Sequence, residues 1–425
     1  MVGRLGLAFG VCLVLSGYES TWIEQYSQEG AAANKTCSAK EYSACRDHLT
    51  KLLEILDGRV DIVYRLAKTE ALLGNQSAAL DWLSVYSKTG LKLADPASDP
   101  AFAQLKELTK YQEVLQQLSE SSKPVSKSQP VKDLPEKDLI AEDLAHDAKT
   151  GRFYISSVRH RKILVEDHGK FSEFLPEGKN ADVWSILALR VDEKRRVLWA
   201  TTAAMPEGLG FDKSLDGRSA LLKFSLESGV LLKRYDVKET GKHALGDMVL
   251  SSAGDAYISD GYGAVYTVRH DKDSLDLLVG PGTFRSPQTP ALTQDERKLF
   301  VPDYTRGISI VDLATKEVKL LEHPRDLSLG GIDGLYFRDG WLIAVQNGTA
   351  PPRIIAMKLD ASLSKVVRWE TLEVNQELGA PTHGVIVGKQ FYFIANSGWD
   401  KMADDGSVKS GATFDFPSIR VMPLP

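Results

Sequence analysis

The stretch that decides the fold is GIDGLYF-RDG-WLIAVQN, residues 331–347. Polar Asp333 stands before a short apolar run, and a second apolar run ends in polar Asn347. The Asp-Gly pair between the two runs is a strong signal for a tight turn joining antiparallel strands. The stretch therefore predicts a β-hairpin whose first strand is headed by a polar residue.

The same pattern recurs along the chain and gives six units after residue 138. Successive heads are separated by 42, 63, 41, 45 and 50 residues, and four-stranded propeller blades need about 40 to 50. The long second interval is attributed to an inserted loop over residues 205–210. We therefore expect a mainly β fold, a six-bladed β-propeller over residues 138–425. Its heads are Glu142, Trp184, Asp247, Gln288, Asp333 and His383.

Residues 37–118 have helical rather than strand periodicity, with small residues where two antiparallel helices would approach closely. Residues 73–75 suit a turn between them, and the pair resembles a tetratricopeptide repeat. Such a unit is expected either to dock a protein partner or to act as a structural cap, and its shortness favours the cap. The polar stretch 119–137 is interpreted as a linker.

Length and composition set further limits. A chain of 425 residues is too long for one ordinary domain, and a net charge of -5 provides no basic surface for nucleic acid. The apolar run Leu5–Leu15 is too short to span a bilayer but fits a signal peptide over residues 1–17. We therefore expect an exported protein, periplasmic or extracellular, that is not membrane-spanning; the alternative is a disordered or buried N-terminal helix. Cys37 and Cys45 would pair in an oxidising compartment or remain free thiols, and their spacing leaves both open.

The heads of the inner strands should share one rim of the central channel with the ends of the second strands. Glu142, Asp247, Gln288 and Asp333 would then converge on the axis. Three carboxylates without an evident basic partner repel one another unless a cation neutralises them. Oxygen ligands favour Ca²⁺ or Mg²⁺. The alternative is that the polar heads only solvate strand ends around a watery channel.

Residues 138–425 resemble the regucalcin/gluconolactonase propellers, which are related more distantly to paraoxonases and strictosidine synthase. Glu142 resembles the Glu ligand of that family's first blade, and Gln288 stands where the family has an Asn. Asp333, in the Ile-Asp-Gly of residues 332–334, resembles the family's Asp ligand. The resemblance implies a divalent cation held by these three residues, most often Ca²⁺, with Mg²⁺, Mn²⁺ or Zn²⁺ as alternatives.

The same resemblance implies a reaction, the metal-dependent opening of a small lactone or related ester. Asp333 would be the general base as well as a ligand, and His383 is a second candidate acid or base. Asp247, Trp184 and Asn347 are candidate substrate contacts. No Gly-x-Ser-x-Gly elbow is present, so a serine mechanism is not expected. The alternative is a non-enzymatic propeller with a helical repeat that serves as a binding or scaffold protein.

Overall fold

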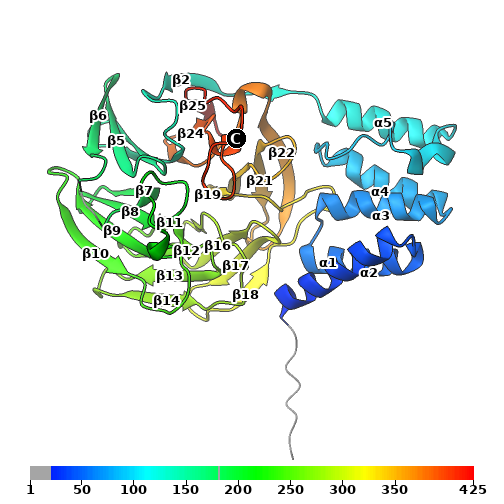
Figure 1. The fold of residues 1–425 in the computed structure, drawn as a ribbon, viewed down its shortest axis with the longest axis horizontal. Helices are drawn as coiled ribbons and strands as arrows, with labels where there is room; N and C mark the ends of the chain where they lie inside the picture. Colours follow the sequence, from blue (N-terminus) through cyan, green and yellow to red (C-terminus); the bar gives the residue numbers. More distant parts are fainter. Residues whose placement is uncertain (1–20, 180–181) are drawn as a thin grey trace, which may run out of the picture.

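The computed structural model describes residues 21–179 and 182–425, which form a helical unit beside a six-bladed β-propeller (Figure 1). In five blades the four strands follow one another outward from the channel, and the sixth is completed by a strand from earlier in the chain. The prediction of a six-bladed propeller is confirmed. The first three blades contain β3 (Ala141–Asp147), β4 (Arg152–Ser157), β5 (Lys162–Asp167), β6 (Lys170–Leu175), β7 (Ser185–Asp192), β8 (Val197–Ala203), β9 (Ser219–Ser225), β10 (Leu231–Asp236), β11 (Leu245–Leu250), β12 (Ala256–Asp260), β13 (Ala264–Val268) and β14 (Leu275–Val279).

The other three blades contain β15 (Ala291–Leu292), β16 (Lys298–Asp303), β17 (Gly307–Asp312), β18 (Val318–Leu320), β19 (Gly334–Arg338), β20 (Trp341–Gln346), β21 (Arg353–Leu359), β22 (Val366–Val374), β23 (Gly384–Val387), β24 (Gln390–Ala395) and β25 (Ser418–Pro423). The hairpin expected at residues 331–347 is β19–β20. Asp339 and Gly340 have φ angles of 49° and 76°, and two positive values are what a type I′ turn requires. The tight turn that the Asp-Gly pair predicts is therefore present in the structure.

Two short strands lie where a linker was expected, so the propeller begins before residue 138. β1 (Val125–Ser126) pairs with β22, and β2 (Gln129–Asp133) pairs with β25 as the outer strand of the sixth blade. The backbone amides of Lys127 and Ser128 also donate to the buried carboxylate of Glu373 over 2.8 and 2.9 Å. An outer strand needs no apolar face and tolerates Pro130 at its edge. The interpretation of residues 119–137 as a linker was therefore wrong.

The helical unit begins earlier than residue 37. Its elements are α1 (Trp22–Ser38), α2 (Tyr42–Leu56), α3 (Val60–Leu72), α4 (Gln76–Lys88), η1 (Pro100–Leu105) and α5 (Thr109–Ser121). The turn expected at residues 73–75 joins α3 to α4, and a disulfide between Cys37 and Cys45 joins α1 to α2. None of the helices in the described ranges is long and apolar enough to cross a membrane. The expected signal peptide, residues 1–17, lies outside the described residues.

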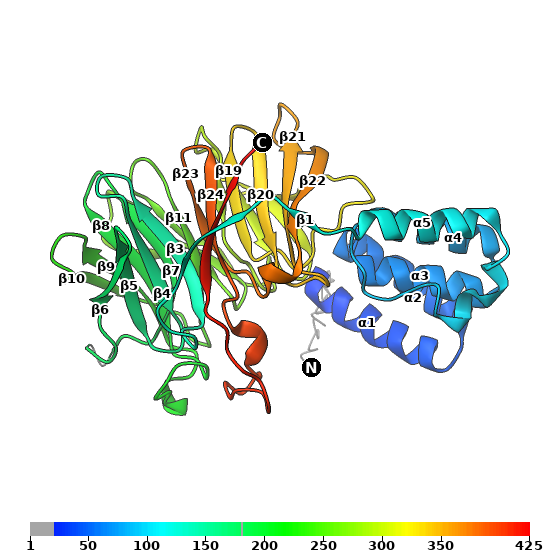
Figure 2. The same ribbon diagram turned by 90° about the horizontal axis from the view of Figure 1, so that it is seen from above.

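The helical unit is docked on the propeller beside blades four and five (Figure 2). The indole of Trp22 donates to the carbonyl of Thr283 over 2.9 Å, and the backbone amide of Lys92 donates to the carbonyl of Ala350 over 2.9 Å. The buried guanidinium of Arg353 donates to the carbonyl of Thr89. Thr283 lies in the loop between β14 and β15 and Ala350 in the loop between β20 and β21, so the helices contact the rim that also carries the polar heads.

Candidate functional site

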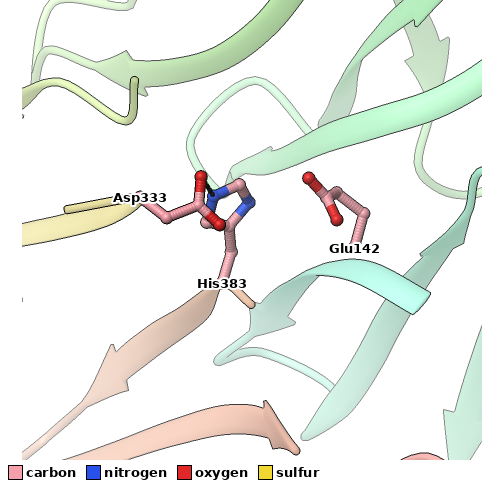
Figure 3. A group of neighbouring side chains, drawn as sticks. All are labelled: Glu142, Asp333 and His383. Carbon is pink, nitrogen blue, oxygen red and sulfur yellow. Dashed lines mark ion pairs between the residues drawn. The ribbon is translucent and has the colours of Figure 1, made fainter. Parts of the chain in front are cut away.

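Three of the expected heads meet on the propeller axis (Figure 3). Glu142 lies in β3, while Asp333 and His383 immediately precede β19 and β23, the inner strands of the fifth and sixth blades. One ligand atom from each of the three residues lies within 4.8 Å of the other two. Backbone hydrogen bonds hold this arrangement, because the amide of His383 donates to the carbonyl of Glu142 and the amide of Asp333 donates to the carbonyl of Val345.

The group is almost completely withdrawn from solvent. Glu142, Asp333 and His383 have exposed fractions of 7%, 9% and 1%. Burial raises the pKa of Glu142, and the same effect raises the pKa of the neighbouring buried carboxyl of Asp247. Burial works against a charge on His383, but Asp247, Asp333 and Glu142 outweigh it and raise the pKa of this imidazole well above its ordinary value. The site therefore concentrates negative charge around one imidazole.

The imidazole of His383 lacks hydrogen bonds. Its Nε2 lies 3.3 Å from Oδ1 of Asp247 and 3.5 Å from Oδ1 of Asp333, within ion-pair range. Neither ring nitrogen is aligned for a hydrogen bond with any residue in the described ranges. Buried polar groups usually have partners, and an imidazole among carboxylates can act in its neutral form as a metal ligand. The donor set of two carboxylates and one imidazole thus fits a divalent transition metal.

A cavity of about 650 Å³ opens onto this group. Glu142, Asp333 and Asn347 line it, together with Tyr304 and Trp399. Asn347 donates to Oδ2 of Asp333 over 2.6 Å and accepts from the hydroxyl of Tyr304 over 3.0 Å. The indole of Trp399 donates to Oε2 of Glu142. The cavity is therefore large enough for a small molecule, and its polar groups are held in place by their neighbours.

The remaining predicted residues do not line the axial cavity. Asp247 is buried against the cluster, where its Oδ1 lies 3.3 Å from Nε2 of His383 and accepts from the hydroxyl of Thr289 over 2.7 Å. The side-chain amide of Gln288 turns back and donates to the hydroxyl of Ser286 over 2.9 Å, and Gln288 does not line the axial cavity. Trp184 lines a different cavity, between the first and second blades. The structure thus brings together Glu142, Asp247, Asp333, His383 and Asn347 but not Gln288 or Trp184.

Sequence reasoning missed Tyr304 and Trp399. Tyr304 directly follows β16, as Asn347 directly follows β20, so the blade register could have identified it. Trp399 opens the 3₁₀ turn η4 (Trp399–Lys401) in the loop after β24, outside any repeated pattern. No periodic signal marks such a residue.

Comparisons with known proteins support the fold. No protein-family model and no curated protein sequence matches the chain. Among solved structures, a luciferin-regenerating enzyme is 15% identical with a TM-score of 0.51, covering 71% of this chain and 96% of its own. A gluconolactonase from Xanthomonas campestris is 12% identical with a TM-score of 0.46, covering 71% and 97%. A chain of the nidogen/laminin complex is 16% identical with a TM-score of 0.40, covering 54% and 79%.

At these identities a likeness shows a fold and not an activity. The similarity to the luciferin-regenerating enzyme extends over nearly the whole of that propeller and over the larger part of this chain. It therefore agrees with the architecture found here. The function has to be argued from the axial residues themselves.

Proposed function

We propose that this protein is a metal-dependent hydrolase of the lactonase type, which opens a small lactone or related ester at the propeller axis. The observation that carries the proposal is the cluster of Glu142, Asp333 and His383, of which Glu142 and Asp333 line a cavity of about 650 Å³. Two carboxylates and an imidazole without hydrogen bonds form a donor set that a divalent cation would satisfy.

The donor set argues for a different cation from the one expected from the sequence. The expected ligands Glu142, Gln288 and Asp333 are all oxygen donors and favour Ca²⁺, whereas the cluster in the structure includes an imidazole nitrogen. Imidazole ligands suit transition metals, and carboxylates are accepted by both Zn²⁺ and Mn²⁺. We therefore propose Zn²⁺ or Mn²⁺ in preference to Ca²⁺ or Mg²⁺.

When bound, a divalent cation polarises a carbonyl oxygen and lowers the pKa of a coordinated water. The chain itself supplies orientation and proton transfer. Asn347 occupies Oδ2 of Asp333, so that Oδ1 of this carboxylate remains available toward His383 and the centre. Asp333 lines the cavity, and its carboxylate is the group that we assign to accept a proton from water. Trp399 holds Glu142 in place.

The proposal is tested by turnover of a lactone panel, for example δ-gluconolactone and γ-butyrolactone, by protein reloaded with Zn²⁺ or Mn²⁺ after chelation. Asp333→Asn retains the shape of the side chain but removes the charge and the proposed base. Its turnover is expected to fall by at least about a hundredfold. Gln288→Ala is the matched control, because Gln288 heads a blade without lining the cavity. Turnover that persists in Asp333→Asn would refute the proposal.

The second candidate is a non-enzymatic binding protein, and one observation favours it. The helical unit contacts the rim at Thr283 and Ala350, beside the mouth of the axial cavity, so a partner bound to the helices would lie near this mouth. A protein that binds Zn²⁺ or Mn²⁺ at the axis but turns over no lactone or ester would support this candidate.

A further inference from the structure

A second cavity, of about 140 Å³, lies away from the axis between the first and second blades. Arg161, in the turn between β4 and β5, forms one wall, and Trp184 and Ser185 at the start of β7 form another. The loop after β8 closes the cavity with Met205 and Phe211, and Asp212 lies at its edge. Trp184 was expected to contact a substrate on the axis, but in the structure it lines this second cavity.

Three buried polar atoms on residues that line this cavity have no partner in the described part of the chain. They are Nε of Arg161, Nε1 of Trp184 and Oγ of Ser185, and each is buried without a hydrogen bond to any residue in the described ranges. Trp184 and Ser185 have exposed fractions of 8% and 1%. Unpaired buried donors are rare and costly, and three around one cavity indicate a missing acceptor.

The cavity is also a preformed one. The guanidinium of Arg234 stacks over the ring of Trp184 at 4.8 Å, and the backbone amide of Trp184 donates to the hydroxyl of Thr202 over 2.8 Å. The loop is tied to the first blade because the amide of Leu209 donates to the carbonyl of Arg159 over 2.8 Å. A Cβ on Gly208 would lie 2.6 Å from Oγ of Ser185, so only glycine allows the loop to close this tightly over the hydroxyl. The donors are therefore fixed before any ligand arrives.

The lining also defines the ligand. The lining residues offer two nitrogen donors and a hydroxyl, and one of the nitrogen donors belongs to a guanidinium that forms no ion pair within the described part of the chain. A guanidinium pairs well with a carboxylate. The side chains of Met205 and Phe211 offer apolar contact to a short carbon chain, and the charge of Asp212 disfavours a doubly charged anion such as phosphate. We propose that this cavity binds a small monocarboxylate, with Arg161, Trp184 and Ser185 as the donors to its carboxylate group.

The test is equilibrium binding of sodium butyrate to the full-length protein at constant ionic strength, measured by ligand-observed NMR and by calorimetry. Arg161→Gln should weaken binding at least about tenfold, because a charge-assisted hydrogen bond is lost. Ser185→Ala should weaken it several-fold. Arg218→Gln is the matched control, since the Arg218 side chain is exposed near the end of the same loop and the charge change is identical. Asp333→Asn separates this cavity from the axial site and should bind butyrate as the wild type does.

Saturable binding with this order of effects supports the proposal. Absence of saturable butyrate binding would overturn it, and so would equal weakening by Arg161→Gln and Arg218→Gln, which would indicate a general charge effect. Loss of binding in Asp333→Asn would also overturn it, because the carboxylate would then bind at the axis. Thermal melting of each variant verifies that it is folded. If Arg161→Gln is unstable, the butyrate affinity of Ser185→Ala tests the proposal instead.

Discussion

The side-chain amide of Asn347 lies 2.6 Å from Oδ2 of Asp333 and donates a hydrogen bond to it. The same amide nitrogen donates to the carbonyl of Pro381 over 3.0 Å, next to the sixth blade that carries His383. Asn347 thereby fixes Asp333 of the fifth blade relative to the start of the sixth. Asn347 thus adds a side-chain link, beside the backbone hydrogen bonds, between the segments that carry two of the three proposed metal ligands.

Asn347→Ala should therefore weaken metal binding without removing a ligand. Hydrogen-bond partners of metal ligands typically contribute about 10- to 100-fold in affinity, and we expect a loss in this range. Calorimetric titration of chelator-treated protein with Zn²⁺ and Mn²⁺ measures it. Gln288→Ala should match the wild type, because Gln288 bonds to Ser286 instead of facing the axial cavity. A larger loss for Gln288→Ala than for Asn347→Ala would contradict this account of the site.

The propeller should depend on the two strands that precede it. A fragment of residues 122–425 retains β1 and β2, whereas a fragment of residues 138–425 exposes the edges of β22 and β25. We expect the shorter fragment to aggregate or to melt at least about 5 °C lower. Differential scanning calorimetry of the two fragments compares them directly, since both lack the helical unit. Equal melting temperatures would show that the sixth blade closes without β2.

The ion pair between Asp147 and Arg196 should make stability depend on acid pH. Both guanidinium NH₂ groups of Arg196 donate to the fully buried carboxylate, over 2.7 and 2.8 Å, and link the first blade to the second. Hydrogen bonds from Arg196 lower the pKa of Asp147 to about 2 from an ordinary 3.8. A carboxyl whose pKa is lower in the folded state stabilises fully above the unfolded pKa, and this stabilisation is lost as the pH falls through the folded pKa.

Arg196→Gln should thus reduce the free energy of unfolding by about 2 kcal/mol or more at pH 7, and the difference from wild type should shrink as the pH approaches 2. Urea unfolding at several pH values measures both trends. The more exposed pair of Arg152 and Asp167 is the control, and Arg152→Gln should change the stability much less than Arg196→Gln. A difference between wild type and Arg196→Gln that grows with acid would contradict the assigned role.

The disulfide between Cys37 and Cys45 closes a short loop between α1 and α2. Its removal in Cys37→Ser should destabilise the helical unit by about 2–3 kcal/mol, because the unfolded chain regains freedom. Thiol titration of the unfolded wild type, before and after reduction, shows whether the two cysteines are bridged. Far-ultraviolet circular dichroism measures the loss of helix on unfolding of the wild type and the variant. Disulfides persist in oxidising compartments, and the expected export stays a prediction. Free thiols at both positions in protein isolated under non-reducing conditions would contradict the pairing.

Much of the fold follows from local patterns in the sequence. The Asp-Gly turn at residues 339–340 and the apolar strands on either side of it are decided by neighbouring residues, and a hairpin of this kind recurs at blade spacing. Glu142, Asp333 and His383 converge because each heads an inner strand, which is a consequence of the repeat. The closing strand β2 has no such pattern, since it is an edge strand that contains a proline.

The sequence predicted the individual site residues less well than it predicted the fold. β15 contains only Ala291 and Leu292, so the sequence could not decide which polar residue before it faces the axis. In the structure Thr289 contacts Asp247, while Gln288 turns away. Trp399 reaches Glu142 from a loop whose course depends on tertiary packing. Residues on aperiodic loops are placed by the whole fold and not by their neighbours in the chain.

The central claim is that Glu142, Asp333 and His383 jointly bind one divalent cation. The most direct measurement is calorimetric titration of chelator-treated wild type, Asp333→Asn and His383→Gln with Zn²⁺, Mn²⁺ and Ca²⁺. We predict one site per chain in the wild type, tighter for Zn²⁺ or Mn²⁺ than for Ca²⁺, with affinity lost in both variants and retained in Gln288→Ala. Absence of binding in the wild type, or binding unaffected by both Asp333→Asn and His383→Gln, would contradict the account.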